Sequence, residues 1–303
     1  MRRGVPTTTT RYSVVGHSRF PDKASPLKKK HALVLSGDGA FGAFHAGWAE
    51  AVARLDRNYN PDVLVGVSFG ALAAGVISQF DAFRDGAMAY SDIWRNGIRS
   101  SRDVYQTRRW RRPRHTAKPL RDLIERHFLV DAVKKDLRVA GIDLTTGETT
   151  VWTESNMRDS KPVYIVSALS VVFEPFAAGQ SLFVSGVSRA SAPVKMAIDA
   201  GAQVIDVLLP GPGAYADRRL RALSLMSHEL VVGDIAHASY INSMVRSGAD
   251  SQHREVDVRV HRPESPLFGS ALDFDSEIVR KNKTTGAEVA TAWLYRKGCY
   301  REG

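Results

Sequence analysis

The sequence predicts an α/β fold with a parallel central sheet, and three observations lead to this prediction. The apolar runs Ala32–Leu35 and Val63–Val65 are short and almost continuous, which is typical of strands buried on both faces of a sheet. A segment with helical periodicity follows each run. The connections between strand and helix are short, and this alternation is typical of parallel sheets.

The expected elements follow one another with clear boundaries. Ser36-Gly37 ends the first strand, Asn60-Pro61 separates the first helix from the second strand, and Thr146-Gly147 lies between the two strands of a hairpin. The expected elements are, in order, strand Ala32–Leu35, a helix with apolar residues Phe44, Trp48, Val52 and Leu55, strand Val63–Val65, an alanine-rich helix Ala71–Ile77, helix Lys118–Phe128, strands Leu137–Ile142, Thr149–Trp152, Ser181–Val184 and Val204–Leu209, and a closing helix Ser276–Tyr295.

Composition limits the class of protein. The chain has 303 residues, of which 44% are apolar and 24% charged, as is usual for a globular protein. No apolar run approaches the ~18 residues of a membrane-spanning helix. Thr7–Thr10 stands where a secretory signal would be apolar. The single cysteine, Cys299, can form neither an intrachain disulfide nor a cysteine-based zinc site. We therefore expect a cytoplasmic protein that either lacks a metal or holds one with Asp and His. The nine histidines show no close metal spacing, so we expect neither a metal nor a cofactor.

The net charge of +10 is concentrated in two segments. Residues 1–30 contain eight basic residues against one acidic residue, and residues 99–121 contain nine against one, which gives net charges of +7 and +8. We expect residues 1–30 to be a flexible tail that precedes one domain over residues 31–303. Basic segments suit phosphate-bearing partners, and here we expect an anionic membrane surface with the protein peripheral to it. A solvated tail and loop is the simpler alternative. No recognition motif supports nucleic-acid binding.

A glycine-rich loop lies between the first strand and the first helix. It fits the pattern G-x-G-x-x-G with Gly37, Asp38, Gly39, Ala40, Phe41 and Gly42. This pattern occurs in dinucleotide-binding turns, which also require an acidic residue at the end of the second strand. That strand ends instead in Val65-Gly66 and leads into a second motif. We therefore expect the N–H groups of the loop to bind an anion other than the pyrophosphate of a dinucleotide.

The second motif, Gly66-Val67-Ser68-Phe69-Gly70, is a G-x-S-x-G between a predicted strand and a predicted helix. This setting is typical of a nucleophile elbow, in which a sharp turn lifts the serine hydroxyl above the sheet. Gly66 and Gly70 allow the neighbouring backbone to approach closely. The glycine-rich loop ends the adjacent strand, so its N–H groups can hold the oxyanion of an acyl transfer at Ser68. A strand–helix turn that merely contains serine is the simpler alternative.

With these two motifs the chain resembles the patatin-like phospholipases over nearly all of residues 31–303. Residues 33–47 are similar to the first strand, loop and helix of that family, and residues 62–72 are similar to its elbow. The resemblance implies a three-layer α/β/α fold with a mostly parallel sheet. It also implies Ser68 as the nucleophile, lipid or phospholipid esters as substrates, and an aspartate that completes a Ser–Asp dyad without histidine.

The aspartate motif of the family is not preserved in this chain. The family has proline eight residues after the aspartate and asparagine six residues after it. Counting back from Pro193 places Ser185 at the aspartate position and Ser191 at the asparagine position. Asp199 with the following Ala-Gly is superficially similar to the aspartate motif and is a candidate for the base. It lies where a helix leads into the next strand, however, whereas the motif of the family lies at the end of a strand. Other candidates for the missing base are a histidine or a partner chain, although His45 is expected to pack rather than to act.

The loop departs from the family as well. Asp38 stands where the family has a third glycine, and Phe41 stands where it has a basic residue. A carboxylate beside an oxyanion repels the developing charge unless it points away. The sequence therefore supports two functions. One is a serine lipid acyl hydrolase, and the other is a catalytically inactive pseudoenzyme that serves as a binding, regulatory or structural module. The sequence does not indicate an oligomeric state.

Overall fold

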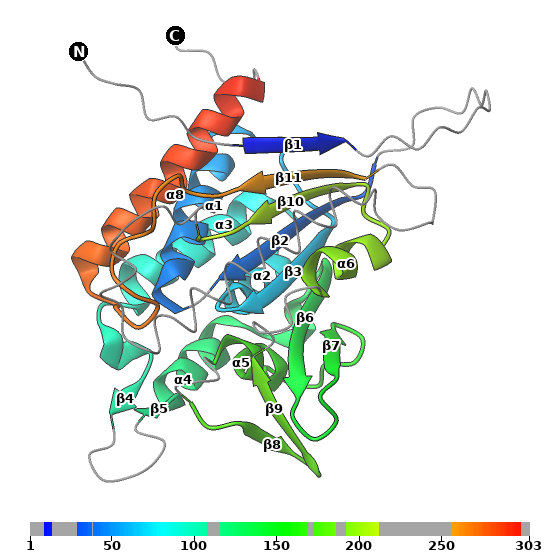
Figure 1. The fold of residues 1–303 in the computed structure, drawn as a ribbon, viewed down its shortest axis with the longest axis vertical. Coiled ribbons are helices and arrows are strands. Elements are labelled where there is room, and N and C mark those ends of the chain that lie inside the picture. Colours follow the sequence, from blue (N-terminus) through cyan, green and yellow to red (C-terminus); the bar gives the residue numbers. More distant parts are fainter. Residues whose placement is uncertain are drawn as a thin grey trace, which may run out of the picture.

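A computed structural model describes residues 9–13, 29–37, 39–107, 115–168, 173–185, 192–211 and 256–297. They form an α/β fold around a nine-stranded sheet (Figure 1). The strand order is β1-β11-β10-β2-β3-β6-β9-β8, and β7 also pairs with β6. The strands are β1 (Thr9–Ser13), β2 (His31–Gly37), β3 (Val63–Ser68), β6 (Asp136–Asp143), β7 (Thr149–Thr153), β8 (Phe176–Ala178), β9 (Ser181–Ser185), β10 (Val204–Leu208) and β11 (Asp257–His261); β4 (Gln106–Thr107) and β5 (His115–Thr116) form a separate pair.

The centre of the sheet is parallel, as predicted. Strands β11, β10, β2, β3 and β6 run in the same direction, and the strands added at either end are antiparallel. The carboxyl ends of the parallel strands therefore meet at one edge of the sheet. In an open α/β sheet this edge is the usual place for a ligand.

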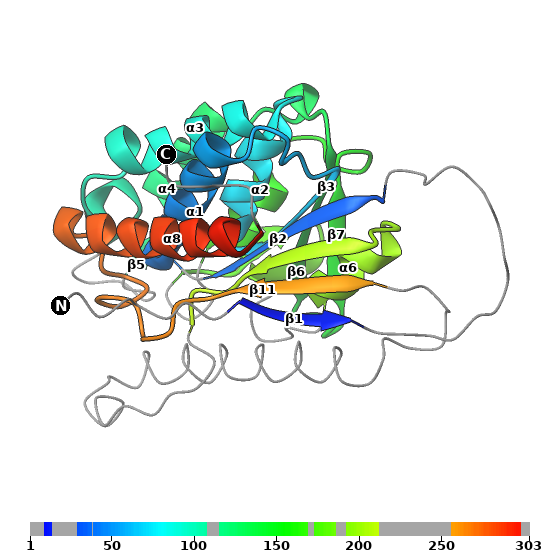
Figure 2. The ribbon, with the colours of Figure 1, turned by 90° about the horizontal axis from the view of Figure 1, so that it is seen from above.

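Helices cover both faces of the sheet, which gives the predicted three layers (Figure 2). Leu33 and Leu64 point towards α1, α2, α3 and α8, while Val34 and Val65 point to the opposite face, where α6 packs. The helices are α1 (Gly42–Leu55), α2 (Gly70–Ser78), α3 (Phe83–Asp92), α4 (Lys118–His127), α5 (Lys161–Ser167), α6 (Ala192–Asp199) and α8 (Ser276–Lys297), with 3-10 turns η1 (Gly39–Phe41), η3 (Ser101–Asp103) and η4 (Val130–Ala132) and a π-helical turn η2 (Ile93–Gly97).

All the strands and helices expected from the sequence are present, with ends displaced by at most three residues. Helices α3, α5 and α6 and strands β1, β4, β5, β8 and β11 are additional, and each is ten residues or shorter. Within residues 1–30, where we expected a flexible tail, β1 pairs with β11 and extends the sheet. Residues 1–8 and 14–28 lie outside the described residues.

Helices α1 and α8 cross with their backbones in contact. A Cβ atom on Gly47 would lie 1.8 Å from the carbonyl oxygen of Lys283, and one on Gly286 would lie 2.0 Å from the carbonyl oxygen of Phe44. No side chain fits at either position. The two glycines therefore fix how closely the last helix lies on the first.

A buried carboxylate, Asp206 of β10, lies beneath these two helices. Four donors from separate parts of the chain converge on it: His31 Nε2 (2.8 Å), the Tyr59 hydroxyl (3.0 Å), the Arg259 guanidinium (2.8 Å) and His261 Nε2 (2.8 Å). Both carboxylate oxygens are thus hydrogen bonded. This arrangement is what a buried charge requires.

The ionisation of this cluster follows from its contacts. Burial by itself raises the pKa of Asp206, but hydrogen bonds from His261 and His31 and the charge of Arg259 outweigh burial and hold the pKa below its ordinary range. Burial lowers the pKa of His261 more than Asp206 raises it. The imidazole of His261 is therefore neutral at pH 7, and Arg259 supplies the countercharge.

We expect Asp206→Asn to lower the free energy of unfolding by about 3–5 kcal/mol, because it leaves the guanidinium of Arg259 without its buried counterion. Urea denaturation measures the loss. Asp199→Asn is the matched control, since Asp199 is exposed and pairs with Lys195 on the surface of α6. Its loss should be below about 1 kcal/mol. Equal losses in the two variants would contradict the role given to the cluster.

Candidate active site

Ser68 ends β3 and stands at a sharp turn into α2. Its φ of 53° makes it the only described residue other than glycine with a left-handed backbone. Such a conformation costs a non-glycine residue about 1–3 kcal/mol and is concentrated at functional sites. The structure thus places the serine of the G-x-S-x-G motif at a strained strand–helix junction, as an elbow requires.

The glycines of this motif are required by close backbone contacts. A Cβ atom on Gly70 would lie 2.1 Å from the carbonyl oxygen of Leu35, on the neighbouring strand β2. A Cβ atom on Gly66 would lie 2.5 Å from the Cα atom of Ala71. The start of α2 can therefore pack directly against β2 only because both positions lack a side chain.

The glycine-rich loop lies beside Ser68. Strands β2 and β3 are parallel, and their register places Gly37 opposite Ser68. The chain then passes through η1, where Gly39 has a φ of 48°, and enters α1 at Gly42. Asp38, which departs from the family pattern, lies outside the described residues. Gly37 is thus the loop residue that the sheet register places directly beside Ser68.

One expected oxyanion donor already has a partner. The N–H group of Ala40 donates to the carbonyl oxygen of Ala271, at 2.8 Å. Ala271 lies in the segment between β11 and α8, more than 200 residues away along the chain. In this structure the Ala40 N–H group is therefore not available to an oxyanion. The sequence motif carries no sign of this contact, because the acceptor is a backbone atom.

Ser185, at the position expected for the dyad aspartate, lies at the same edge of the sheet as Ser68. It ends β9 and pairs with Gly141 of β6. On the same strand Val139 pairs with Gly66, two residues before Ser68. Both serines therefore lie level with Gly141. Position 185 thus lies level with Ser68 but two strands away from it, and a serine hydroxyl there cannot act as a general base near pH 7.

Asp199 is not part of this site. It ends α6, its side chain is 50% exposed, and it forms an ion pair with Lys195 at 2.8 Å. Helix α6 packs on the face of the sheet that Val63 and Val65 line, whereas Leu64, Gly66 and Ser68 alternate to the other face. The sheet thus separates Asp199 from the hydroxyl of Ser68. Within the described residues, no carboxylate or imidazole forms a hydrogen bond with Ser68.

His45 lies in α1 directly beneath the loop, as expected for a packing residue. It is fully buried, and its Nε2 atom lies 3.2 Å from the carbonyl oxygen of Ser36. Burial lowers the pKa of His45 to about 4, although the hydrogen bond to Ser36 acts in the opposite direction. The imidazole is therefore neutral at pH 7, with Nε2 donating to the carbonyl group.

The site is closed around Ser68, which has no exposed surface. A narrow space lined by Gly39 of the loop and by Phe69, the residue after Ser68, has no room for a water molecule. Its walls also include Ser167, whose hydroxyl is buried and forms no hydrogen bond with the described residues. The lining residues are Gly39, Phe69, Val104, Leu120, Ser167, Phe173, Leu272 and Phe274. Sequence reasoning missed Ser167, because it belongs to no recognisable motif. The segment Asp273-Phe274-Asp275 is similar to the same part of the family, but the sequence did not indicate that Phe274 lies at this space.

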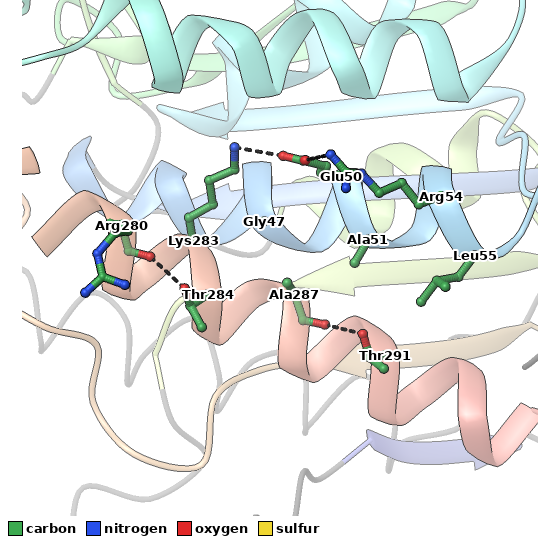
Figure 3. A pocket seen from close by; sticks show the side chains of 10 residues that line it. All are labelled: Gly47, Glu50, Ala51, Arg54, Leu55, Arg280, Lys283, Thr284, Ala287 and Thr291. Carbon is green, nitrogen blue, oxygen red and sulfur yellow. Dashed lines mark hydrogen bonds and ion pairs between the residues drawn. The ribbon is translucent and has the colours of Figure 1, made fainter. Parts of the chain in front are cut away.

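A larger groove of about 400 Å³ lies elsewhere, between α1 and α8 (Figure 3). Its floor includes Ala51 and Ala287, and Glu50 at its rim forms ion pairs with Lys283 (2.7 Å) and Arg54. None of the residues of the loop or the elbow lines this groove. The described residues contain no cluster of His, Cys, Asp and Glu suited to a metal ion, and no helix among them is long and apolar enough to span a membrane.

Comparisons with known proteins agree with the motifs. A family model for the patatin-like phospholipases matches residues 33–198, more than half of the chain. No curated protein matches the sequence. Among solved structures, the chain is similar to VipD from Legionella pneumophila, with 12% identity, a TM-score of 0.44 and coverage of 89% of this chain and 67% of VipD. It is also similar to the type III effector protein ExoU, with 14% identity, a TM-score of 0.39 and coverage of 92% of this chain and 55% of ExoU.

We expect His45 to make the protein less stable in acid. Its pKa of about 4 in the folded state lies below the ordinary value near 6.5, so between these values the unfolded chain binds the proton more tightly. The contribution is fully present above pH ~6.5, and about 3 kcal/mol is lost as the pH falls to about 4. Urea denaturation at both pH values should show a loss that is about 3 kcal/mol smaller in His45→Gln, where glutamine can still donate to Ser36. An identical acid loss in the two proteins would refute this assignment.

Proposed function

Because the chain belongs to the patatin-like phospholipase family, we propose that it hydrolyses lipid or phospholipid esters through Ser68, at a rate held low by the serine at position 185. The backbone of Ser68 is the observation that supports this most directly. A left-handed serine between a strand and a helix, with Gly37 beside it, has the geometry of an acyl-transfer nucleophile. A turn with only a structural role could relieve this strain with glycine at the same position.

In the proposed reaction, Ser68 Oγ attacks the ester carbonyl carbon and its proton passes to the departing alcohol. Water then hydrolyses the acyl-serine and releases the fatty acid. The negative charge on the carbonyl oxygen forms next to the loop, where N–H groups around Gly39 and the N-terminus of α2 stabilise it. These donors are backbone groups, so the replacement of family residues at positions 38 and 41 does not remove them.

Within the described residues, the proposed reaction lacks a side chain that accepts the hydroxyl proton of Ser68. In the family pattern a carboxylate accepts it, and here Ser185 occupies that place. General-base assistance is worth about 10²–10⁴ in rate, so the chemical step should be slower by this order. Lipid esters remain the substrate class that fits the family and the apolar side chains around the narrow space.

The second candidate function is a catalytically inactive patatin-fold module that binds lipid esters or a partner without turnover. Ser185 favours it, because the loss of the carboxylate removes the group that activates the nucleophile. The bonded N–H group of Ala40 and the full burial of Ser68 also favour it. The two candidates differ in whether any hydrolysis depends on Ser68.

We expect Ser185→Asp to raise the turnover of a fluorogenic fatty-acid ester and of a phospholipid by about 10²–10⁴, because it restores a carboxylate at the level of Ser68. Turnover by the wild type and by Ser185→Asp should both be lost when Ser68→Ala is added. The matched control is Ser181→Asp, which places a carboxylate at the other end of β9. It should leave turnover at the wild-type value.

The outcomes separate the two candidates. Wild-type hydrolysis that is lost in Ser68→Ala supports the slow hydrolase. A silent wild type with an active Ser185→Asp variant supports the inactive module. If Ser185→Asp and Ser181→Asp behave alike, position 185 is not the place of the missing base.

We also propose that the basic segments 1–30 and 99–121 bring the protein to anionic lipid surfaces. Residues 108–114, which carry most of the arginines of the second segment, lie outside the described residues. Substituting glutamine for the arginines at positions 108, 109, 111, 112 and 114 should weaken binding to phosphatidylglycerol vesicles and reduce its salt dependence. Phosphatidylcholine vesicles are the uncharged control, and duplex DNA tests nucleic-acid binding. Unchanged vesicle binding would show that these arginines are only solvated charges.

A further inference from the structure

A segment between β11 and α8 contacts both the glycine-rich loop and Phe69, the residue after Ser68. We refer to residues 267–275 as the strap; they lie on the orange path that leads into α8 (Figure 1). The carbonyl oxygen of Ala271 accepts the N–H group of Ala40 at 2.8 Å. The next carbonyl oxygen, of Leu272, accepts the hydroxyl groups of Tyr105 (3.1 Å) and Ser101 (3.4 Å). Two successive peptide groups of the strap are thus hydrogen bonded across the site.

Phe274 of the strap belongs to an aromatic cluster that includes Phe69, the residue after Ser68. The ring of Phe274 stacks on Trp94, with centroids 6.2 Å apart and planes 13° apart. It also contacts Phe69 (6.0 Å) and Tyr105 (6.4 Å). Phe69 directly follows Ser68, so Phe274 packs against the elbow itself. The strap therefore covers both parts of the site, the loop through Ala271 and the elbow through Phe274.

The start of the strap is anchored independently of the site. The buried amide of Asn282, in α8, accepts the N–H group of Phe268 (2.8 Å) and donates to its carbonyl oxygen (3.0 Å). Gly269 then has a φ of 73°, which favours glycine there. One end of the strap is thus held by Asn282 and the other is continuous with α8, so both ends are fixed independently of the contacts to Ala40 and Phe69.

The space beneath the strap contains a polar group that lacks a partner. The hydroxyl of Ser167 is buried, lines this space with Leu272 and Phe274, and forms no hydrogen bond with the described residues. A buried hydroxyl without a partner is costly. The remaining walls are mostly apolar, which suits an acyl chain, and the hydroxyl of Ser167 suits an ester oxygen.

From these contacts we infer that the strap is an autoinhibitory element, which closes the site to acyl esters and occupies the Ala40 N–H group that an oxyanion requires. The inference rests on the proposed function of the Ser68 site. Moving residues 271–274 away frees the N–H group and opens the space lined by Phe69 and Ser167. An acyl chain then replaces Phe274 as the apolar neighbour of Phe69. Only ligands that bind the open form can shift the protein towards it.

The test loosens the strap without touching Ser68 or the loop. The double variant Ser101→Ala/Tyr105→Phe removes both side-chain donors to Leu272, and Phe274→Leu loosens the aromatic contact should the first variant fold poorly. Tyr164→Phe is the matched control, because it removes a tyrosine hydroxyl from α5, outside the strap contacts. Two readouts do not depend on turnover: hydrogen exchange of the Ala40 amide, and affinity for a fluorescent ether-linked phospholipid, which cannot be hydrolysed.

We expect the loosened strap to speed the exchange of the Ala40 amide about tenfold and to tighten lipid binding by a similar factor, because two hydrogen bonds of the closed form are lost. In the Ser185→Asp background, turnover should rise in parallel. Wild-type exchange and affinity in both strap variants would overturn the inference, as would faster exchange without tighter binding. If the Ser185→Asp variant shows no turnover that depends on Ser68, the proposed function is wrong. The exchange of the Ala40 amide and the lipid affinity still test the role of the strap in that case.

Discussion

The contact between the bare backbone of Gly70 and the carbonyl oxygen of Leu35 is the constraint on which the candidate site depends. It lets the first turn of α2 lie directly on β2, and the turn at Ser68 has to be sharp to reach it. The same contact fixes the end of β2, and thereby the start of the glycine-rich loop, at the level of the serine. The left-handed backbone at position 68 is therefore part of the packing between β2, β3 and α2, and the strain arises because a serine and not a glycine occupies that position.

A second constraint holds the strap against this site. Gly47 and Gly286 let α1 and α8 touch through their backbones, and α1 begins where the loop ends. The strap leads directly into α8, so both partners of the hydrogen bond between Ala40 and Ala271 are attached to one rigid pair of helices. The pair of helices therefore holds the N–H group of Ala40 close to the carbonyl oxygen of Ala271, and the strap itself need not be rigid. This separation allows a stable scaffold to carry a segment that can move.

The sequence predicted the features that depend on a short-range residue pattern. It did not predict the features that depend on contacts of backbone atoms or on residues far apart in the chain. The elbow and the loop could be predicted, because glycine spacing between strand and helix patterns records them directly. The assignment of Ser185 rests on the spacing to Pro193 in the family that the chain resembles, and it stays a prediction. The cluster at Asp206 could not be predicted, because its donors come from residues as far apart as His31 and His261 and each is unremarkable alone. The closure by Ala271 left no trace in the sequence either, since any residue has a carbonyl group.

The two features that restrain the proposed chemistry act on different quantities. The serine at position 185 raises the barrier of the chemical step after an ester has bound, so it lowers turnover and leaves affinity unchanged. The strap changes the fraction of molecules that can bind, and a site open 1% of the time loses about 100-fold in apparent affinity without any change in the barrier. The rate at low substrate concentration depends on the product of the open fraction and the rate of the chemical step. Restoring a carboxylate at position 185 changes only the chemical step, so the effect of the strap on the open fraction remains. In the proposed reaction, ester hydrolysis by the unmodified chain is thus limited twice, once by the serine at position 185 and once by the inferred closure of the strap.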